Sequence, residues 1–262
     1  MKHKVFFSLF AILICAFTVS CCKSDKCESD KVCESSRKQI YEWRIYTLTG
    51  NNTAALDDFF QESLIPAYNR HNISVGAFSL YNPEEKDQRY LLFVYPDLKT
   101  YDQVRQDIWN DSEFLKSAGP FFETTAPNPA YTPYETYLCE AFDKMPEMRI
   151  PDKSRTLFEY RNYFSPNEEA NLRKIKMFNV EEIDLFDKVG INSVFYGEVL
   201  AGTRMPALIY LLWSKDEEAH NNAWNAFRVH PEWERMKNDP AYKHTATNNQ
   251  AKLLSPMPYS QF

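Results

Sequence analysis

Glycine is scarce in this sequence, with 6 among 262 residues, and no glycine-rich phosphate loop is present. Neither a GxGxxG nor a GxxxxGK(S/T) string occurs, which excludes the common nucleotide-binding fingerprints. No GxSxG string is present, so a serine hydrolase elbow is not indicated. The 5 histidines form no HExxH or HxxxH pair. The sequence therefore predicts no metal site of the zinc-enzyme type.

Excess positive charge is also lacking. The formal net charge is −6 and the sequence pI is about 5.5, so the basic face that a nucleic-acid partner needs is not expected. The hydrophobic fraction of 44% and the charged fraction of 25% are ordinary for globular proteins. They exclude a collagen, a disordered chain and a multi-span membrane protein. Aromatic residues are abundant, at 15%.

The first twenty residues have the pattern of a secretory signal peptide. Lys2 and Lys4 precede an apolar run over 5–19, which is shorter than the roughly 20 residues of a membrane span. Residues 18–21, Thr-Val-Ser-Cys, resemble a bacterial lipobox, which predicts lipidation at Cys21. Cleavage before Cys22, an ordinary signal peptidase site and an uncleaved anchor are the alternatives. The prediction is an exported protein, anchored in the cell envelope by lipid alone.

Residues 21–38 are polar and nearly free of large apolar side chains, so this segment predicts a disordered tether. It contains Cys22, Cys27 and Cys33. Three thiols could bind a soft metal or form disulfides in an oxidising compartment. No histidine lies among them and their spacing is not CxxC, which argues against a metal site. Cys139 lies far away, in a predicted strand, where it is expected to behave as a small buried apolar residue.

The rest of the chain contains two copies of one unit. Residues 41–46, Tyr-Glu-Trp-Arg-Ile-Tyr, recur as Phe-Glu-Tyr-Arg-Asn-Tyr at 158–163. In each copy a helical stretch, two strands, a second helix and a closing strand follow this opening. The predicted helical stretches are 53–71 and 167–189. The predicted strands are 73–82, 89–96 and 134–142 in the first copy, and 191–200, 206–213 and 252–259 in the second.

Local signals support these elements. Ser165 and Ser214 each begin a string typical of a capping box, which predicts a helix N-terminus at each. Residues 89–95 and 207–213 are nearly continuous apolar runs, as expected for strands that are covered on both faces.

The order strand, helix, strand, strand, helix, strand is the ferredoxin-like βαββαβ arrangement. The predicted fold class is α+β, with two tandem ferredoxin-like repeats that pack their sheets together as a pseudo-dimeric α/β barrel. The predicted domains are a signal peptide (1–20), the tether (21–38), a first repeat (39–142), a linker (143–155) and a second repeat (156–262).

The paired Glu-aromatic-Arg-x-Tyr openings resemble the NIPSNAP family of the dimeric α/β-barrel superfamily. Residues 223–233, Ala-Trp-Asn-Ala-Phe-Arg-Val-His-Pro-Glu-Trp, are similar to that family's second-helix segment, whereas 108–111 in the first copy lack the Pro-Glu-Trp. The resemblance covers about 40–262. It implies a barrel from one chain and no established catalytic residues. Superfamily relatives include cofactor-free oxygenases and haem-binding proteins, with sites inside the barrel or between sheet and helices.

Strand alternation separates the opening residues into two faces. We expect the aromatic set, with Trp43 and Tyr160, to contact the helices, and the Glu/Arg/Tyr set to point into the barrel. There the polar groups could orient an anionic or carbonyl-bearing ligand, or they could be self-satisfied ion pairs that fix strand register. The candidate ligand-binding residues are Glu42, Arg44, Tyr46, Glu159, Arg161 and Tyr163.

Other candidates are weaker. His71, at a helix end, is explained by the helix dipole, and nothing in the pattern selects His220, His230 or His244 as an axial ligand for haem. Trp224, Phe227 and Trp233 at helical spacing are expected to be core residues.

Two functional hypotheses follow. The first is an envelope-tethered protein, monomeric with an internal pseudo-dimer or assembled further, that binds a small hydrophobic or aromatic ligand or a protein partner. The alternative is a cofactor-independent or haem-using monooxygenase-like enzyme acting inside the barrel. A roomy, polar barrel interior would favour a ligand site there, whereas an interior filled by aromatic rings would favour a structural role.

Overall fold

The computed structural model describes residues 37–85 and 87–262, which form one compact unit. The predicted signal peptide, Cys21 and nearly all of the tether lie outside the described residues. Within the described part of the chain, no helix is long and apolar enough to cross a membrane.

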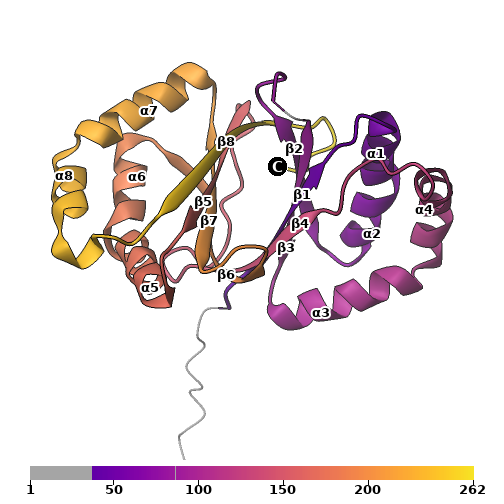
Figure 1. Cartoon of the computed structure of the whole chain (residues 1–262), viewed down its shortest axis with the longest axis horizontal. Coiled ribbons are helices and arrows are strands. Elements are labelled where there is room, and N and C mark those ends of the chain that lie inside the picture. Colours follow the sequence, from indigo (N-terminus) through magenta and orange to yellow (C-terminus); the bar gives the residue numbers. More distant parts are fainter. Residues whose placement is uncertain (1–36, 86) are drawn as a thin grey trace, which may run out of the picture. The chain divides into compact units, whose positions relative to one another are not determined.

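Two βαββαβ repeats follow one another, as predicted (Figure 1). The elements of the first repeat are β1 (Ile40–Thr47), α1 (Thr53–Phe59), the π-helical turn η1 (Phe60–Leu64), α2 (Ile65–Arg70), β2 (Ser74–Leu80), β3 (Gln88–Tyr95), α3 (Leu98–Asp107), the 3-10 turn η2 (Ile108–Asn110), α4 (Ser112–Thr125) and β4 (Glu135–Ala141). Those of the second are β5 (Leu157–Phe164), α5 (Glu168–Met177), the π-helical turn η3 (Phe178–Glu182), α6 (Ile183–Val189), β6 (Asn192–Gly202), β7 (Ala207–Ser214), α7 (Glu217–Val229), α8 (Pro231–Asn238), the 3-10 turn η4 (Pro240–Tyr242) and β8 (Asn248–Pro256).

The eight strands close into one antiparallel barrel with the order β1-β3-β2-β8-β5-β7-β6-β4. Each repeat contributes four neighbouring strands, and the repeats join through β2 with β8 and β4 with β6. Closure pairs the edge strands of each repeat with those of the other, which reduces the tendency of edge strands to aggregate. Helices α1–α4 lie outside the first repeat's strands and α5–α8 outside the second's (Figure 1). The pseudo-dimeric barrel fold is confirmed.

Two predicted helix starts were wrong by two residues. Asn167, rather than Ser165, caps α5 by accepting the N–H of Ala170. The Ser165 hydroxyl is turned inward, where it donates to the carbonyl of Thr245 at 2.7 Å and lies 3.2 Å from Oδ1 of Asn171, rather than accepting a backbone N–H of the helix. At α7 the cap is Asp216, because Ser214 is still paired in β7. The closing strand β8 begins four residues earlier than expected, at Asn248.

The barrel interior is filled by aromatic rings from both repeats. Trp43 stacks on Tyr160 with ring centroids 4.9 Å apart, and Phe78 meets the edge of Phe158 at 4.8 Å. Cys139 is a free thiol buried in the same cluster, as expected. By the criterion set out from the sequence, this packing favours a structural role for the interior.

The chain after β8 returns along β2 and covers the part of that strand that β8 leaves unpaired. The amide of Met257 donates to the carbonyl of Ala77 at 2.9 Å, and the ring of Phe262 enters the barrel. Gly76 permits this approach, because a Cβ there would lie 2.5 Å from the Phe262 ring.

Candidate functional site

The polar residues of the opening strands do not point into the barrel, and this prediction was wrong. Trp43 and Tyr160 fill the interior, whereas Glu42, Arg44, Glu159 and Arg161 face the helices. Alternation along a strand defines two faces but does not say which face is the interior. Glu42 and Glu159 are buried on the helix side as well, but there Tyr95, His220 and Trp224 supply hydrogen-bond partners to their carboxylates. The closed interior is filled by aromatic rings, which gain from burial and would leave a Glu–Arg pair with little compensation.

As a consequence, the six candidate residues form two separate clusters, one in each repeat. In the first repeat, Arg44 donates two hydrogen bonds to the carboxylate of Glu42, at 2.6 and 3.0 Å, and a third to the hydroxyl of Tyr68. The hydroxyl of Tyr95 donates to Glu42 at 2.9 Å. Tyr46 packs against the ring of Phe60. This cluster satisfies itself, and its pairs match the alternative of ion pairs that fix the structure.

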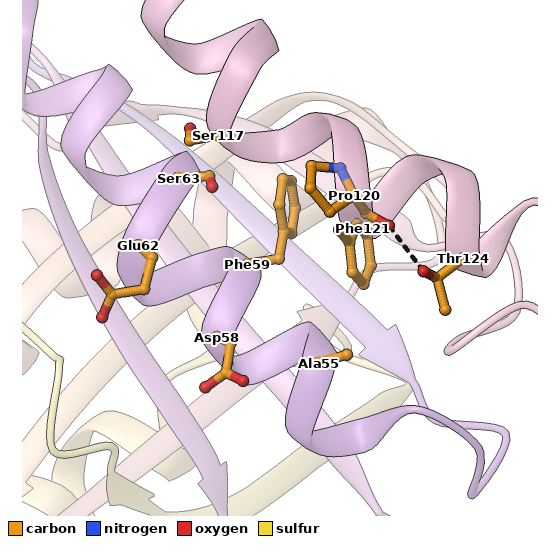
Figure 2. A pocket seen from close by; sticks show the side chains of 9 residues that line it. All are labelled: Ala55, Asp58, Phe59, Glu62, Ser63, Ser117, Pro120, Phe121 and Thr124. Atoms are coloured by element: carbon orange, nitrogen blue, oxygen red, sulfur yellow. Dashed lines mark hydrogen bonds between the residues drawn. The ribbon is translucent and has the colours of Figure 1, made fainter.

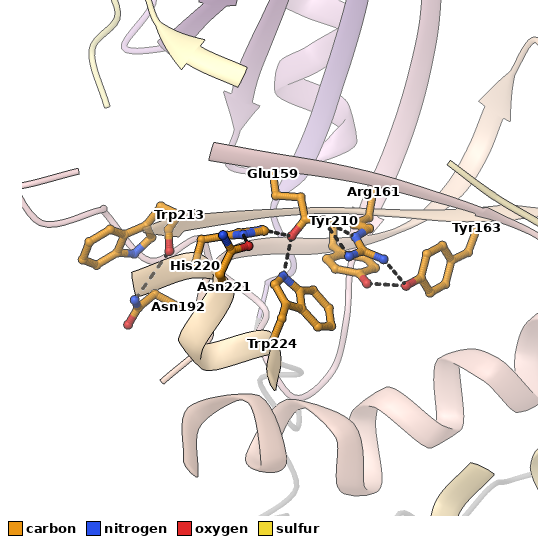
Figure 3. Close-up of polar contacts among 9 residues, drawn as sticks. All are labelled: Glu159, Arg161, Tyr163, Asn192, Tyr210, Trp213, His220, Asn221 and Trp224. Atoms are coloured by element: carbon orange, nitrogen blue, oxygen red, sulfur yellow. Dashed lines mark hydrogen bonds and ion pairs between the residues drawn. The ribbon is translucent and has the colours of Figure 1, made fainter. Parts of the chain in front are cut away.

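The second cluster is centred on Glu159, whose carboxylate collects donors from β5 and α7 (Figure 3). Arg161 donates to one oxygen at 2.7 Å. The indole N–H of Trp224 donates to the other oxygen at 2.7 Å, and His220 Nε2 lies 3.0 Å from it. Arg161 also donates to Tyr163, which accepts from Tyr210 at 2.7 Å. One buried carboxylate therefore holds a tryptophan, an arginine and a histidine together.

The contact between Glu159 and His220 lowers the pKa of the carboxyl group and raises that of the imidazole. Burial acts to raise the pKa of Glu159, but the hydrogen bond from His220 and the charge of Arg161 outweigh it and lower that pKa. Burial acts to lower the pKa of His220, but the hydrogen bond and charge of Glu159 outweigh it and raise that pKa. Each partner favours the charged form of the other, so the imidazolium and carboxylate are stabilised together.

Beside this cluster lies a cavity of about 290 Å³ between the sheet and the helices of the second repeat. The indole of Trp224 stacks under the guanidinium of Arg161, with 4.3 Å from Cζ to the ring centroid. At the back of the cavity Lys174 and Glu182 form a buried ion pair of 2.9 Å. The lining residues are Arg161, Tyr163, Lys174, Glu182, Trp224, Phe227, Arg228, Trp233 and Asn249.

Trp224 and Phe227 are buried, as the expectation of core residues required, and they also form a wall of this cavity. Sequence reasoning missed His220, Lys174, Glu182 and Arg228. A signal for two of them exists: at a repeat offset of 118, Lys174 and Glu182 replace two leucines of the first copy. Two leucines would fill the same space in the second copy, so the charged pair indicates a role beyond packing.

A different cavity, of about 270 Å³, lies in the first repeat between α1–η1 and α4 (Figure 2). The stacked rings of Phe59 and Phe121, 4.4 Å apart, form one side, and the carboxylates of Asp58 and Glu62 lie at its open edge. It is not the counterpart of the second-repeat cavity, because it lies between helices and none of Glu42, Arg44 and Tyr46 lines it.

The remaining histidines have structural roles or lie apart. His71 ends α2, and His230 caps α8 by accepting the N–H of Glu232. No histidine lines the Trp224 cavity, and both ring nitrogens of His220 have partners, Glu159 and Asn221. These residues do not fit haem with an axial histidine in that cavity. Within residues 37–85 and 87–262, no group of three or more His, Cys, Asp or Glu side chains could hold a metal ion.

Comparison with known structures identifies the fold. The chain superposes on a monooxygenase-like protein of Lactobacillus acidophilus NCFM with a TM-score of 0.54, at 11% identity over 84% of this chain and 94% of that one. A similar protein of Fusobacterium nucleatum gives a TM-score of 0.51, at 11% identity over 84% and 93%. A mutant chlorite dismutase of Candidatus Nitrospira defluvii also gives 0.51, at 8% identity over 84% and 92%. At these identities the likeness shows the fold alone, which is the dimeric α/β barrel.

The second repeat also matches a known family in sequence. The NIPSNAP family profile matches residues 158–261, which confirms the resemblance noted in the sequence for the second repeat. The match includes Glu159, Arg161, His220 and Trp224, and it leaves out the first repeat. No protein of curated function matches the sequence.

Proposed function

We propose that this protein is an envelope-tethered NIPSNAP-like binding protein that holds a small aromatic anion in the Trp224 cavity of the second repeat. The observation that carries the proposal is the lining of that cavity, where Trp224, Phe227 and Trp233 provide flat apolar walls beside the guanidinium groups of Arg161 and Arg228. This combination suits a ligand with an aromatic body and a carboxylate or similar anionic group.

The charges support an anionic ligand. Three cations line the cavity, and two carboxylates, Glu159 and Glu182, neutralise Arg161 and Lys174. Within the described residues, Arg228 has no carboxylate within ion-pair distance and donates only to the side chain of Asn225. An arginine fork with open donors at the mouth of an aromatic cavity is suited to a carboxylate.

Binding of 2-naphthoate, compared with its neutral analogue 2-naphthamide, tests this proposal in the full chain by isothermal titration calorimetry. We expect the acid to bind at least about tenfold more tightly, because one charge-assisted hydrogen bond is added. Arg228→Gln should remove the preference for the acid. The matched control is Arg105→Gln, an exposed arginine on α3 of the first repeat. Equal affinity for acid and amide would contradict the proposal.

A second candidate function is a cofactor-independent, monooxygenase-like enzyme that acts on a ligand in the same cavity. The observation that favours it is the titratable pair of His220 and Glu159, which is joined to the cavity through Trp224. Oxygen-electrode measurements with 1-hydroxy-2-naphthoate test it. Oxygen consumption that His220→Gln removes would support the enzyme, and no consumption above a protein-free control would contradict it.

The envelope tether is proposed from the sequence. We expect the wild-type protein to label with palmitate and to partition into detergent, and Cys21→Ala to abolish both. Cys22→Ala is the control for the alternative register. Labelling that persists in Cys21→Ala but not in Cys22→Ala would move the lipidated residue to Cys22, and labelling of neither wild type nor variants would contradict a lipid anchor.

A further inference from the structure

A second cavity adjoins the first. It has a volume of about 280 Å³ and shares Lys174, Trp233 and Asn249 with the Trp224 cavity. Its other wall is formed by the end of α8 and by the segment that leads from η4 to β8, with Lys237, Lys243 and Thr245 among the lining residues. Because three side chains line both cavities, the two spaces are neighbours.

The segment that forms the second cavity is fixed rather than loosely attached. Arg173 on α5 donates to the carbonyls of Ala241 and Lys243 at 2.9 and 3.0 Å. The buried hydroxyl of Ser165 donates to the carbonyl of Thr245 at 2.7 Å. His244, between these anchors, has a left-handed backbone with φ of 58°. A non-glycine residue rarely adopts this conformation unless its surroundings impose it, so the cavity wall is held in one shape.

Each cavity has one cation whose charge is not matched by a carboxylate. Lys174 pairs with Glu182 at 2.9 Å, and Lys237 pairs with Glu234. Among the residues that the structure describes, Lys243 has no carboxylate within ion-pair distance, and the same holds for Arg228 in the first cavity. The two unmatched cations therefore line two different cavities, and Trp233 lines both of them.

We propose that the two cavities bind a single elongated ligand with an anionic group at each end, a dianion whose aromatic body lies against Trp233. Arg228 holds one anionic group and Lys243 holds the other. This inference rests on the proposed function and narrows the ligand class from a monoanion to a dianion. A ligand of this kind matches both charges of the lining, whereas a monoanion leaves one cation unmatched.

The test compares 2-naphthoate with naphthalene-2,6-dicarboxylate and biphenyl-4,4′-dicarboxylate by calorimetry on the full chain. We expect at least one dicarboxylate to bind about tenfold more tightly than 2-naphthoate. Lys243→Gln should remove that gain and leave 2-naphthoate affinity within about twofold of wild type. Arg228→Gln should weaken both kinds of ligand. Lys116→Gln, an exposed lysine on α4, is the control for a general loss of positive charge.

The outcomes separate this inference from the proposed function. If 2-naphthoate binds in an Arg228-dependent way but neither dicarboxylate binds more tightly, the dianion is wrong and the anion site stands. A gain that Lys116→Gln reduces as much as Lys243→Gln does would also overturn the dianion, because it would reflect net charge alone. If neither class of acid binds better than 2-naphthamide, the proposed function fails, and this inference fails with it.

Discussion

The two repeats share one backbone plan but fill the space between sheet and helices differently. Leu56 lies four residues before the π turn η1 and Leu64 ends that turn, and both side chains are buried. At the same places around η3 the second repeat has Lys174 and Glu182, which are equally buried and form an ion pair. The first repeat therefore has an apolar filling where the second has a charged pair at the back of a cavity.

The π turns themselves do not mark the site. Such turns are often found at functional sites, but here each repeat has one at the same point of its first helix. Because both repeats have this turn, it is a property of their common fold and does not indicate a functional site in one of them. What distinguishes the second repeat is the chemistry of the side chains that this shared backbone presents to the sheet.

A second pair of equivalent positions also carries different chemistry in the two repeats. Tyr101 and His220 each lie four residues after the aspartate that caps α3 or α7. Tyr101 packs edge-on against the ring of Tyr95, with centroids 5.2 Å apart. His220 instead bonds the carboxylate of Glu159. One repeat uses this helical position for packing, and the other uses it for a titratable group next to a cavity.

The largest expected effect comes from breaking the buried ion pair. Lys174→Met strands the carboxylate of Glu182 and should lower the free energy of unfolding by about 3–5 kcal/mol. The double variant Lys174→Leu with Glu182→Leu, which copies the first repeat, should recover most of this loss. Urea denaturation measures both, and calorimetry should show that the double variant no longer binds 2-naphthoate.

Leu56→Met in the first repeat is the matched control, because it introduces the same residue without stranding a charge. Its cost should stay below about 1.5 kcal/mol. If the double variant is as unstable as Lys174→Met, the pair is not interchangeable with the two leucines, and the comparison between the repeats fails at this point.

The next effect separates the two Glu–Arg pairs. Arg44→Met should cost about 3–5 kcal/mol, because Glu42 then keeps only the hydroxyl of Tyr95. Arg161→Met should cost about half as much, since Glu159 keeps its donors from His220 and Trp224. Denaturant midpoints with unchanged m-values measure the difference.

Glu42→Gln and Glu159→Gln, added to their respective arginine variants, should each restore part of the stability. The reverse order of costs would show that the donors around Glu159 do not compensate. A midpoint for Arg161→Met equal to that of wild type would place the guanidinium in water.

The smallest effect is a pH dependence that only the second repeat should show. Because the folded pKa of His220 is raised above 6.5, its contribution is fully present below that value and is lost as pH rises through the folded pKa. Because the folded pKa of Glu159 is lowered below 4.5, its contribution is present above 4.5 and is lost as pH falls through its folded pKa. The pair therefore stabilises most between pH 4.5 and 6.5.

His220→Gln keeps a donor but removes the charge, so it should cost about 1 kcal/mol in this window and progressively less towards pH 9. Tyr101→Phe, at the matching position of the first repeat, should have a cost that does not vary with pH. Urea midpoints of both variants and wild type from pH 4.5 to 9 measure this. A pH-independent cost for His220→Gln would mean that the imidazole is not charged in the folded protein.

The sequence by itself determined the repeat, the order of the elements and the barrel. The opening hexapeptide recurs at 158–163, and the apolar runs 89–95 and 207–213 require cover on both faces, which two open sheets supply by closing on one another. The resemblance of residues 223–233 to the NIPSNAP family could also be recognised from the sequence, because it depends on local residue types.

Only the tertiary structure decided which strand face became the interior and which residues meet. Trp43 and Glu42 alternate in the same strand and both are buried. The choice between them depends on the hydrogen-bond partners that Tyr68 and Tyr95 supply to the Glu42–Arg44 pair on the helix side, which no local pattern encodes. Glu159 and His220 are 61 residues apart, and their contact exists because α7 packs on β7, the neighbour of β5 in the barrel. The site could not be predicted from the sequence for this reason: its chemistry depends on distances between elements, whereas the fold depends on patterns within them.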